Sequence, residues 1–464
     1  FKRRVFSHQS GLWGVGVNHS QPRQCSHPIS IACMHCLWIK HASQLVQVSN
    51  TGVSSLTGDA MKDIVVIDDG SMVIDANGII EAVGTTSDLE NRYGNVAFQK
   101  VLDANGMCII PGLVDGHTHP VWCGDRVHEF AMKLAGATYL EVHKMGGGIG
   151  FTVEHIRRAS EEELITLLIP RLDAMLRHGT TMIEAKSGYG LETEAELKML
   201  RVLHRASITH PIDIVSNFLG AHSVPKGSDA ASYAKLVCDE QIPAVVASNA
   251  RNETSVEFVD VFHEKGVFEG VETRQILQAA KEAGFLLNFH GDELHPMESG
   301  VLAAELQATA VSHCEHVSEE GMRQMAAANV AAVLLPTTAY MLRIAYPPAQ
   351  ALIAHQVPVA LGSDFNPNAH CLSLPMVMHL SCVNMHLTME EALVAATLNA
   401  AASMNRAEKH GSLEVGKCGD FLVLDATHWK HLIYALGDEP IRSVWKSGQC
   451  VYQRPDAVPV LRSA

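Results

Sequence analysis

Two histidines separated by one residue, His117 and His119, end a short apolar run in this 464-residue chain. Residues i and i+2 of a β-strand project from the same face, so both imidazoles can reach one point in space. Imidazole nitrogen is a common ligand of divalent ions such as zinc and iron. Because the chain contains 26 histidines, the pair alone could arise by chance. It indicates a metal site only if further ligands stand at the ends of later strands.

Three later apolar runs also end in metal-ligating side chains, namely His290, His313 and Asp364. Together with His117 and His119, we expect His290 and Asp364 to hold one divalent metal ion and to leave a position open for water. Such an ion lowers the pKa of bound water from about 15.7 towards about 7. Asp364, beside the metal, is then placed to accept the proton of that water.

Two further polar residues could take part in the chemistry. Glu293 lies three residues after His290 and could face the substrate and carry a proton, although a surface carboxylate is the alternative interpretation. His313 could orient the attacked carbonyl group or complete the metal shell. The first role is favoured because four protein ligands are already present.

The elements that must position these residues follow a regular pattern. Eight apolar runs occur in the middle of the chain, at residues 111–119, 180–185, 212–219, 256–262, 285–289, 309–312, 330–335 and 358–361. Helical stretches lie between most of them. This alternation predicts an α/β fold, a (β/α)8 barrel of the TIM type with its active site at the carboxyl ends of the strands.

An open, doubly wound sheet is the alternative to the barrel. It is disfavoured because the glycines of residues 146–150 lack the spacing of a dinucleotide-binding motif and do not follow a strand. We expect this glycine-rich segment to form a loop over the barrel mouth. Among the helices, Ser160 and Glu163 form a capping-box pattern before residues 161–178, where Pro170 should kink or split the helix. Thr388 repeats the pattern before residues 392–404.

The two ends of the chain differ from the middle. Residues 37–110 and 409–464 contain short β-branched runs, and Asp69-Gly70 and Asn77-Gly78 between such runs predict hairpin turns. We expect both ends to pair into one small β-sandwich beside a barrel of residues 111–408. Residues 1–36 hold four basic and no acidic residues, which favours a disordered extension, with a targeting segment as the alternative.

Composition narrows the possible partners. A net charge of −15 argues against a nucleic-acid partner, and no uncharged apolar run approaches the length of a membrane span. Eleven scattered cysteines, an odd number, indicate reduced thiols and a reducing compartment, for which the cytosol is expected. The oligomeric state stays open, with a homodimer as one expectation.

Five motifs together resemble those of a known family. They are Asp115-Gly-His-Thr-His-Pro-Val-Trp-Cys-Gly-Asp-Arg126-Val-His-Glu-Phe130, Lys186-Ser-Gly-Tyr-Gly-Leu191, Gly220-Ala-His222, His290-Gly-Asp-Glu293 and Gly362-Ser-Asp-Phe-Asn-Pro367. The His-x-His pair is shared across the metal-dependent amidohydrolase superfamily, whereas the second and fifth motifs resemble the imidazolonepropionase family in particular. The resemblance extends from about Leu37 to the carboxyl end. It implies hydrolysis of the cyclic amide of 4-imidazolone-5-propanoate to N-formimidoyl-L-glutamate, a step of histidine degradation.

The resemblance also implies roles for individual residues. It implies one divalent ion, zinc or iron, on His117, His119, His290 and Asp364. It implies substrate contacts from Arg126, Tyr189, His222, Glu293, Asn366, Asn368 and Ala369. His313 matches the family's histidine at the sixth strand, which assists the reaction, although His316 is close enough in sequence to be an alternative. A guanidinium suits the propanoate of the substrate, whereas a tyrosine hydroxyl and an imidazole can hold its polar ring.

Other functions fit parts of the pattern. A two-metal cyclic-amide hydrolase would need a bridging carbamylated lysine at the fourth strand, but Lys186 ends the second and is expected to support the site through a salt bridge or hydrogen bond. A nucleobase deaminase would share the ligands but would not need Arg126. A non-enzymatic scaffold, the remote alternative, should lack the ligands altogether.

Overall fold

The computed structural model describes residues 35–136, 147–455 and 461–463. Its larger part is built on an eight-stranded parallel sheet in which the strands lie side by side in chain order. The strands are β6 (Leu113–Thr118), β7 (Thr180–Lys186), β8 (Asp213–Ala221), β9 (Val256–His263), β10 (Leu286–Gly291), β11 (Ala310–His313), β12 (Ala331–Leu334) and β13 (Val359–Leu361). Each coincides with one of the eight predicted runs, which confirms the predicted barrel.

The barrel closes between its first and last strands. Thr118 at the end of β6 forms a parallel bridge with Phe365, four residues past the end of β13. The amide of His119 donates to the carbonyl of Phe365 over 2.9 Å, and the amide of Asp364 donates to the carbonyl of His117 over 3.0 Å. The seam of the barrel is therefore made at the carboxyl ends of the strands, by the same residues that were expected to bind metal.

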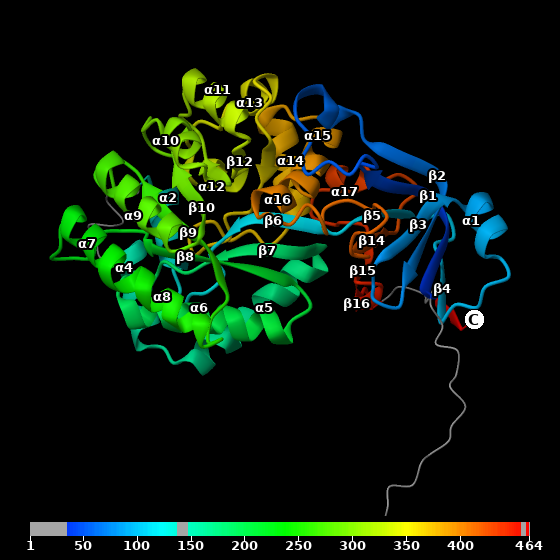
Figure 1. The fold of residues 1–464 in the computed structure, drawn as a ribbon, viewed down its shortest axis with the longest axis horizontal. Helices are drawn as coiled ribbons and strands as arrows, with labels where there is room; N and C mark the ends of the chain where they lie inside the picture. The colour runs from blue at the N-terminus through cyan, green and yellow to red at the C-terminus, as the bar shows by residue number, and fades with distance from the viewer. Residues whose placement is uncertain (1–34, 137–146, 456–460, 464) are drawn as a thin grey trace, which may run out of the picture.

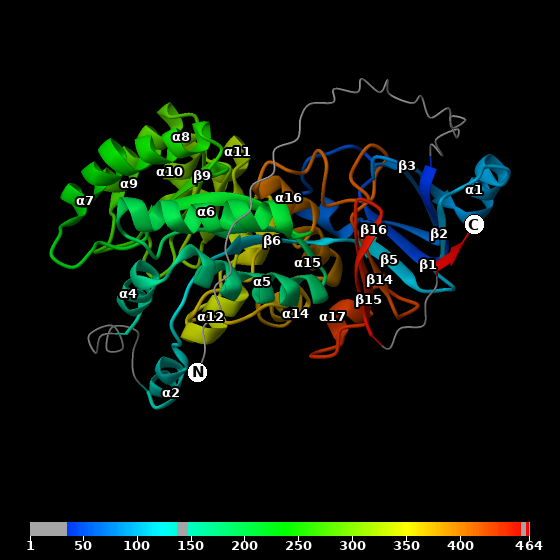
Figure 2. The same ribbon diagram turned by 90° about the horizontal axis from the view of Figure 1, so that it is seen from below.

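Helices surround the strands and bury them (Figure 1, Figure 2). After β6 come α2 (Val127–Leu134), α4 (Ile149–Arg158) and α5 (Glu161–Arg177), then α6 (Thr193–Thr209), α7 (Ala230–Leu236), the π-helical turn η2 (Val237–Gln241), α8 (Ile242–Ala250), α9 (Gly270–Glu282), α10 (Ser299–Leu306), α11 (Glu319–Ala328), α12 (Pro336–Leu342), α13 (Ala349–Ala354), α14 (Leu374–Met385), α15 (Met389–Ala395) and α16 (Leu398–Ser403). All residues of β6, β7, β11, β12 and β13 are buried. Among the described residues, the helices are all too short or too polar to span a membrane.

Both predicted capping boxes are present, but the helices that follow differ from the prediction. Ser160 begins α5, which runs without a break through Pro170. Proline removes one helical hydrogen bond, and the burial of Leu164, Leu168 and Leu172 on one face of α5 offsets that loss. The prediction that Pro170 splits this helix is therefore wrong.

The second capped helix is not continuous. Thr388 begins α15, but Thr397 separates α15 from α16 with φ −136° and ψ −95°. The hydroxyl of Thr397 donates to the carbonyl of Leu393 over 2.6 Å, the acceptor that its own amide would use in a continuous helix. The glycine-rich segment also differs from the prediction. Residues 147–148 precede α4, and residues 149–150 begin that helix rather than extending a loop.

The two chain ends build a second sheet beside the barrel (Figure 1). Its strands are β1 (His35–Val48), β2 (Val65–Asp75), β3 (Ile80–Thr85), β4 (Lys100–Asp103), β5 (Cys108–Pro111), β14 (Phe421–Leu424), β15 (Ile441–Lys446), β16 (Gln449–Gln453) and β17 (Leu461–Ser463). The long strand β1 pairs with β2 on one side and with β4 and β5 on the other, so the sheet branches there. β5 pairs with β14, and β4 with β17, so the ends of the chain meet as predicted. The sheet also carries the short helices η1 (Gly58–Lys62), α1 (Thr86–Tyr93) and α17 (His431–Tyr434).

One predicted hairpin turn in this sheet lies inside a strand instead. Asn77-Gly78 does turn the chain between β2 and β3, but Asp69-Gly70 lies inside β2. Asp69 has a positive φ of 47°, and a Cβ on Gly70 would lie 2.3 Å from Cβ of Leu45 on β1. Glycine is therefore required here because two strands approach each other closely. The same Asp-Gly pair is typical of a hairpin turn, which is why the sequence suggested one.

Candidate active site

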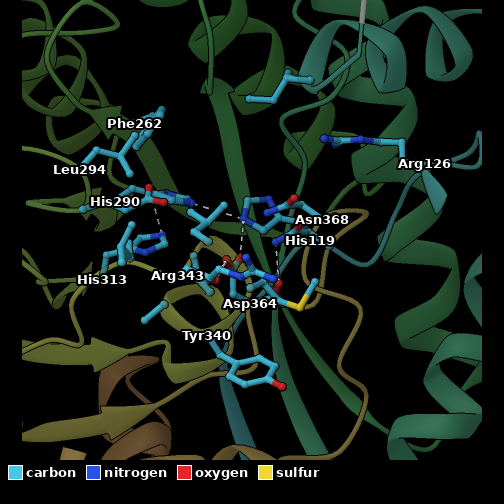
Figure 3. A pocket seen from close by; sticks show the side chains of 18 of the residues that line it. His119, Arg126, Phe262, His290, Leu294, His313, Tyr340, Arg343, Asp364 and Asn368 are labelled. Atoms are coloured by element: carbon cyan, nitrogen blue, oxygen red, sulfur yellow. Dashed lines mark hydrogen bonds and ion pairs between the residues drawn. The ribbon is translucent and has the colours of Figure 1, made fainter. Parts of the chain in front are cut away.

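Three imidazoles and one carboxylate converge at the carboxyl end of the barrel (Figure 3). His117 and His119 come from the end of β6, His290 from β10, and Asp364 from the turn after β13. Nε2 of His119 lies 3.3 Å from Nε2 of His117 and 3.3 Å from Nε2 of His290. Oδ1 of Asp364 lies 3.5 Å from Nε2 of both His117 and His119. All four residues are buried.

These four donors fit one divalent metal ion. Ligands that each lie about 2.0–2.2 Å from a common ion are separated from one another by about 3–3.6 Å, and four of the six separations within this set are 3.3–3.5 Å. Burial holds the pKa of all three imidazoles well below the usual value, so each ring is neutral and carries a free lone pair. Oδ1 of Asp364 accepts no hydrogen bond from the described residues. It is a buried acceptor that a cation would satisfy.

A buried ion-pair network orients one of the four ligands. Oδ1 of Asp260 on β9 lies 2.9 Å from Nδ1 of His290, which leaves Nε2 of that ring directed at the cluster. Nζ of Lys186 lies 2.7 Å from Oδ2 of Asp260 and 2.5 Å from Oε1 of Glu184. Lys186 is fully buried at the end of β7. Lys186 therefore supports the site through ion pairs formed at the end of the second strand. It does not stand at the end of the fourth strand, where a lysine that bridges two metal ions was expected.

Asp364 is held by its own loop and by α12. The hydroxyl of Thr338 donates to Oδ2 of Asp364. Nδ2 of Asn366 donates to the carbonyl of Asp364 over 2.7 Å, and its Oδ1 accepts from the amides of Asn368 and Ala369 over 2.6 and 3.1 Å. The amide group of Asn366 thus closes the turn that carries Asp364, in addition to lining the cavity.

His313 lies between two carboxylates beside the ligand cluster. Its Nε2 is 3.6 Å from Oε2 of Glu293, and its Nδ1 is 3.8 Å from Oε2 of Glu315. Burial alone would lower the pKa of His313, but the two carboxylates outweigh burial and raise it. Burial raises the pKa of Glu293 to about 7. His316 is exposed, and its amide bonds to the carbonyl of Asp292, so the structure places His313 rather than His316 at the site.

The cluster opens into a cavity of about 890 Å³. Of the residues expected to contact substrate, six line it: Arg126, Tyr189, His222, Glu293, Asn366 and Asn368. Ala369 does not, because it is buried against a neighbouring cavity of about 430 Å³. Its predicted role as a substrate contact therefore has no support in the shape of the main cavity.

Arg126 and His222 present defined polar atoms to the cavity. Nη2 of Arg126 donates to Glu129 over 2.8 Å, whereas its buried Nε has no partner among the described residues. Nδ1 of His222 lies 2.9 Å from the carbonyl of Gly188 and so carries the proton, which leaves Nε2 as an acceptor. Figure 3 shows Arg126 across the cavity from His290 and His313. A ligand can therefore span from the ion-binding end to a guanidinium.

Known proteins are similar to this chain over most of its length. The model of the amidohydrolase family matches residues 137–452. A protein of Nematostella vectensis described as "probable imidazolonepropionase" is 54% identical over 91% of this chain and 100% of its own length. Proteins with the same description from Dictyostelium discoideum and Homo sapiens are 57% and 50% identical over 90% and 91% of this chain, and 98% and 100% of their own lengths.

The chain belongs to the imidazolonepropionase family. It is accordingly a hydrolase, and the resemblance drawn from its five motifs is confirmed. Among solved structures, a triazine hydrolase variant superimposes with a TM-score of 0.69 at 16% identity, covering 90% of this chain and 94% of the other. An adenosine deaminase of Xanthomonas campestris with bound zinc superimposes with a TM-score of 0.62 at 18% identity over 91% and 94%. At these identities the likeness shows the fold alone.

Some residues of this imidazolonepropionase-family site were not predicted from the sequence. Asp260 interrupts the apolar run at residues 256–262, and a lone acid in a buried strand was a signal that could have been used. Glu315 follows His313 by two residues and gave no such signal. Thr338 lies on α12 and Arg343 directly follows that helix; both come after the seventh strand, to which no site residue had been assigned.

Proposed function

We propose that the protein hydrolyses the cyclic amide bond of 4-imidazolone-5-propanoate to give N-formimidoyl-L-glutamate, a step of histidine degradation. The observation that carries this proposal is a buried guanidinium, Arg126, in the same cavity as the ligand cluster of His117, His119, His290 and Asp364. Membership of the imidazolonepropionase family supports the choice of substrate. A substrate with one carboxylate and one attackable ring carbonyl has the two features that this cavity can hold.

The ring is bound and oriented by residues in the segments that follow three strands, β6, β7 and β8. Arg126 binds the propanoate, and its Nε supplies a donor that is otherwise unpaired. Nε2 of His222 accepts from a ring N–H, while the hydroxyl of Tyr189 holds the other edge of the planar ring. The carbonyl carbon is thereby held at the carboxyl ends of β6 and β10. Holding it there in one orientation lowers the barrier to attack by water.

His117, His119, His290 and Asp364 would hold the metal ion. When bound, the ion supplies a Lewis acid and lowers the pKa of water so that hydroxide forms at neutral pH. Asp364 accepts the proton that the water gives up. His313, held between Glu293 and Glu315, donates a hydrogen bond to the ring carbonyl and stabilises the negative charge that develops on its oxygen.

Opening of the ring requires a proton at the leaving nitrogen. Glu293 lines the cavity and has a pKa raised to about 7 by burial, so both its protonated and ionised forms are accessible near neutral pH. We assign it this proton transfer. The carbon–nitrogen bond of the amide then breaks, the carbonyl carbon becomes a carboxylate, and the nitrogen leaves as part of an amidine.

The ion is zinc or iron in this proposal, because both accept three imidazoles and a carboxylate. We propose one ion for each chain, held where two groups of possible ligands, His117 with His119 and Asp364 and His117 with His290 and His313, share His117. We also propose that the protein acts in the cytosol as a homodimer on a small-molecule substrate, without nucleic acid or membrane. The eight cysteines that can be assessed in the structure are all free thiols, in keeping with a reducing compartment.

Turnover with and without metal tests the proposal. The purified protein is stripped with a chelator, reconstituted with zinc or with ferrous iron, and given freshly made 4-imidazolone-5-propanoate. The proposal predicts that the reconstituted protein forms N-formimidoyl-L-glutamate and the stripped protein does not. Reconstituted protein that verifiably holds metal but leaves this substrate unchanged would contradict it.

A further inference from the structure

The main cavity is lined by a second arginine, which the roles above leave unused. Arg343 lies on the loop after α12 and is exposed at the cavity mouth. Arg126 has a carboxylate partner in Glu129 at 2.8 Å, whereas Arg343 forms no ion pair with any carboxylate in the described part of the chain. Figure 3 shows the two arginines well apart in the cavity wall, on either side of Asp364. Two arginines placed apart in this way match two separate anionic groups better than one small carboxylate.

The local backbone places Arg343 close to the ligand cluster. α12 begins directly after β12, and its third residue, Thr338, donates a hydroxyl hydrogen bond to Asp364. Five residues of helix rise about 7.5 Å, so the backbone of Arg343 lies within the reach of a long side chain from that contact. Arg343 ends the helix with φ 56° and ψ 40°, a left-handed conformation that is unfavourable for a residue with a Cβ.

The proposed reaction creates an anion that the substrate lacks. The oxygen of water adds to the ring carbonyl carbon, and the electron pair of the carbon–nitrogen bond passes to the leaving nitrogen, which takes up a proton. The substrate carries one carboxylate. The product carries two carboxylates and one amidinium, so net charge is conserved while a new carboxylate appears at the ion-binding end of the cavity.

That new carboxylate forms near two other carboxylates, and the positive groups beside it in this proposal, the bound ion and His313, are already assigned to the ring carbonyl and to Glu293 and Glu315. Glu293 and Asp364 line the same cavity, and like charges at close range are unfavourable. Lys186 cannot neutralise it, because this lysine is fully buried between Glu184 and Asp260. Arg126 is engaged with Glu129 and is assigned to the propanoate tail.

We propose that Arg343 binds the carboxylate that the reaction creates. The cavity then holds the product through two separate guanidinium groups, Arg126 on the old carboxylate and Arg343 on the new one. The inference rests on the proposed function, since it takes its second anion from that reaction. It predicts that Arg343 matters for the affinity of the product and little for the affinity of a ring compound with one carboxylate.

Two ligands separate these roles on the full-length, metal-loaded protein. N-formimidoyl-L-glutamate carries both carboxylates, and 3-(imidazol-4-yl)propanoate carries the ring and the tail carboxylate only. Dissociation constants for both are measured by calorimetry on wild type, Arg343→Gln, Arg343→Lys and Arg126→Lys. Arg323→Gln, an exposed arginine paired with Glu320 on α11, is the control for the loss of one positive charge.

Arg343→Gln is expected to weaken binding of the product about tenfold or more, the effect of one charge-assisted hydrogen bond, and to change binding of the imidazole compound less than about twofold. Arg343→Lys should recover part of the product affinity, Arg126→Lys should weaken both ligands, and Arg323→Gln neither. Equal weakening of both ligands by Arg343→Gln, or no weakening of either, would overturn the inference.

Failure of the inference can be told from failure of the proposed function. Turnover of 4-imidazolone-5-propanoate by the wild-type preparation is measured alongside the binding experiments. A wild type that turns over the substrate while Arg343→Gln binds product normally removes only the role of Arg343. A metal-loaded wild type that does not act on this substrate removes both.

Discussion

The amide of Asp364 donates to the carbonyl of His117 over 3.0 Å, and the side chains of the same two residues face each other with Oδ1 of Asp364 3.5 Å from Nε2 of His117. The first contact closes the barrel between the first and last strands. The second forms one edge of the ligand cluster. Closure of the fold and assembly of the site are therefore the same structural event, and a bound ion should tie the seam more tightly.

Removal of the metal should consequently lower stability. A ligand present at 100 times its dissociation constant stabilises the folded state by about 2.7 kcal/mol, and a chelator would remove that contribution. We expect the melting temperature to fall by a few degrees and amide exchange to rise at β6 and β13. The control is Asp364→Ala, which lacks one ligand and should show little response to the same chelator. Wild-type protein that holds metal but melts identically without it would contradict this account of the seam.

Lys186→Met should lower both the stability of the protein and its affinity for metal. The substitution leaves Asp260 and Glu184 buried without their cation, and breaking a buried pair in this way costs about 3–5 kcal/mol. Because Asp260 orients His290, metal affinity should also fall by about 10–100-fold. Metal affinity is read by competition with a chromogenic chelator, and stability by urea denaturation.

A matched substitution in the other sheet separates stability from metal binding. Lys417 is also buried, with its Nζ 3.2 Å from Oε1 of Glu414, far along the chain from every ligand. Lys417→Met should lose stability but keep metal affinity. If Lys186→Met kept its metal affinity as well, the positioning role of Lys186 would be wrong.

Arg126→Lys should raise KM. Lysine keeps the charge but loses the planar fork that binds a carboxylate through two parallel hydrogen bonds, so KM is expected to rise about tenfold or more. If the tail is held equally in the ground and transition states, kcat should change little. Steady-state kinetics with 4-imidazolone-5-propanoate checks this, and an unchanged KM would remove Arg126 from the substrate site.

The interface between the barrel and the end sheet should lose stability at alkaline pH. Burial alone would lower the pKa of His410, but its interactions with Asp420 and Cys418 together outweigh burial and raise that pKa to about 9. Lys446 and Asp213 complete the network, with Nζ of Lys446 2.6 Å from a carboxylate oxygen of both Asp213 and Asp420. A raised folded-state pKa means that this stabilisation is complete below the unfolded value of 6.5 and is lost as pH rises through about 9.

The matching experiment compares wild type with His410→Gln from pH 6 to pH 10. Wild type should lose on the order of 3 kcal/mol of unfolding free energy over that range through His410. His410→Gln should start less stable and show a flatter profile. Parallel profiles for the two proteins would show that His410 does not titrate as the geometry indicates.

The sequence was sufficient to predict the barrel and the convergence of the proposed ligands at one end of it, because both depend on local pattern. Each strand is a short apolar run, and each ligand stands directly at the end of such a run, as His290 does. In a barrel the carboxyl ends of all strands lie at one face. Residues that are far apart in the sequence can therefore be predicted to be neighbours from the order of the strands alone. Both capping boxes could be predicted because each depends on only four consecutive residues.

What could not be predicted depends on contacts between segments. The pairing of Lys186 with Asp260 joins two strands, and neither residue indicates the other in the sequence. The Asp69-Gly70 pair has the composition of a turn, but it lies within β2, where the approach of Leu45 from the neighbouring strand β1 requires the glycine. Ala369 lies on the correct loop, yet the fold of that loop turns it towards the neighbouring cavity.

The most direct test of the central claim follows the oxygen of water into the product. Metal-loaded protein is given 4-imidazolone-5-propanoate in water enriched in oxygen-18, and the product is fragmented in a mass spectrometer. Attack on the ring carbonyl by water activated at the His117, His119, His290 and Asp364 cluster predicts one heavy oxygen in the new α-carboxylate of N-formimidoyl-L-glutamate, and none with stripped protein. A label on the one-carbon unit instead would mean that the other ring carbon is attacked, as in a deaminase-like reaction, and would contradict the account.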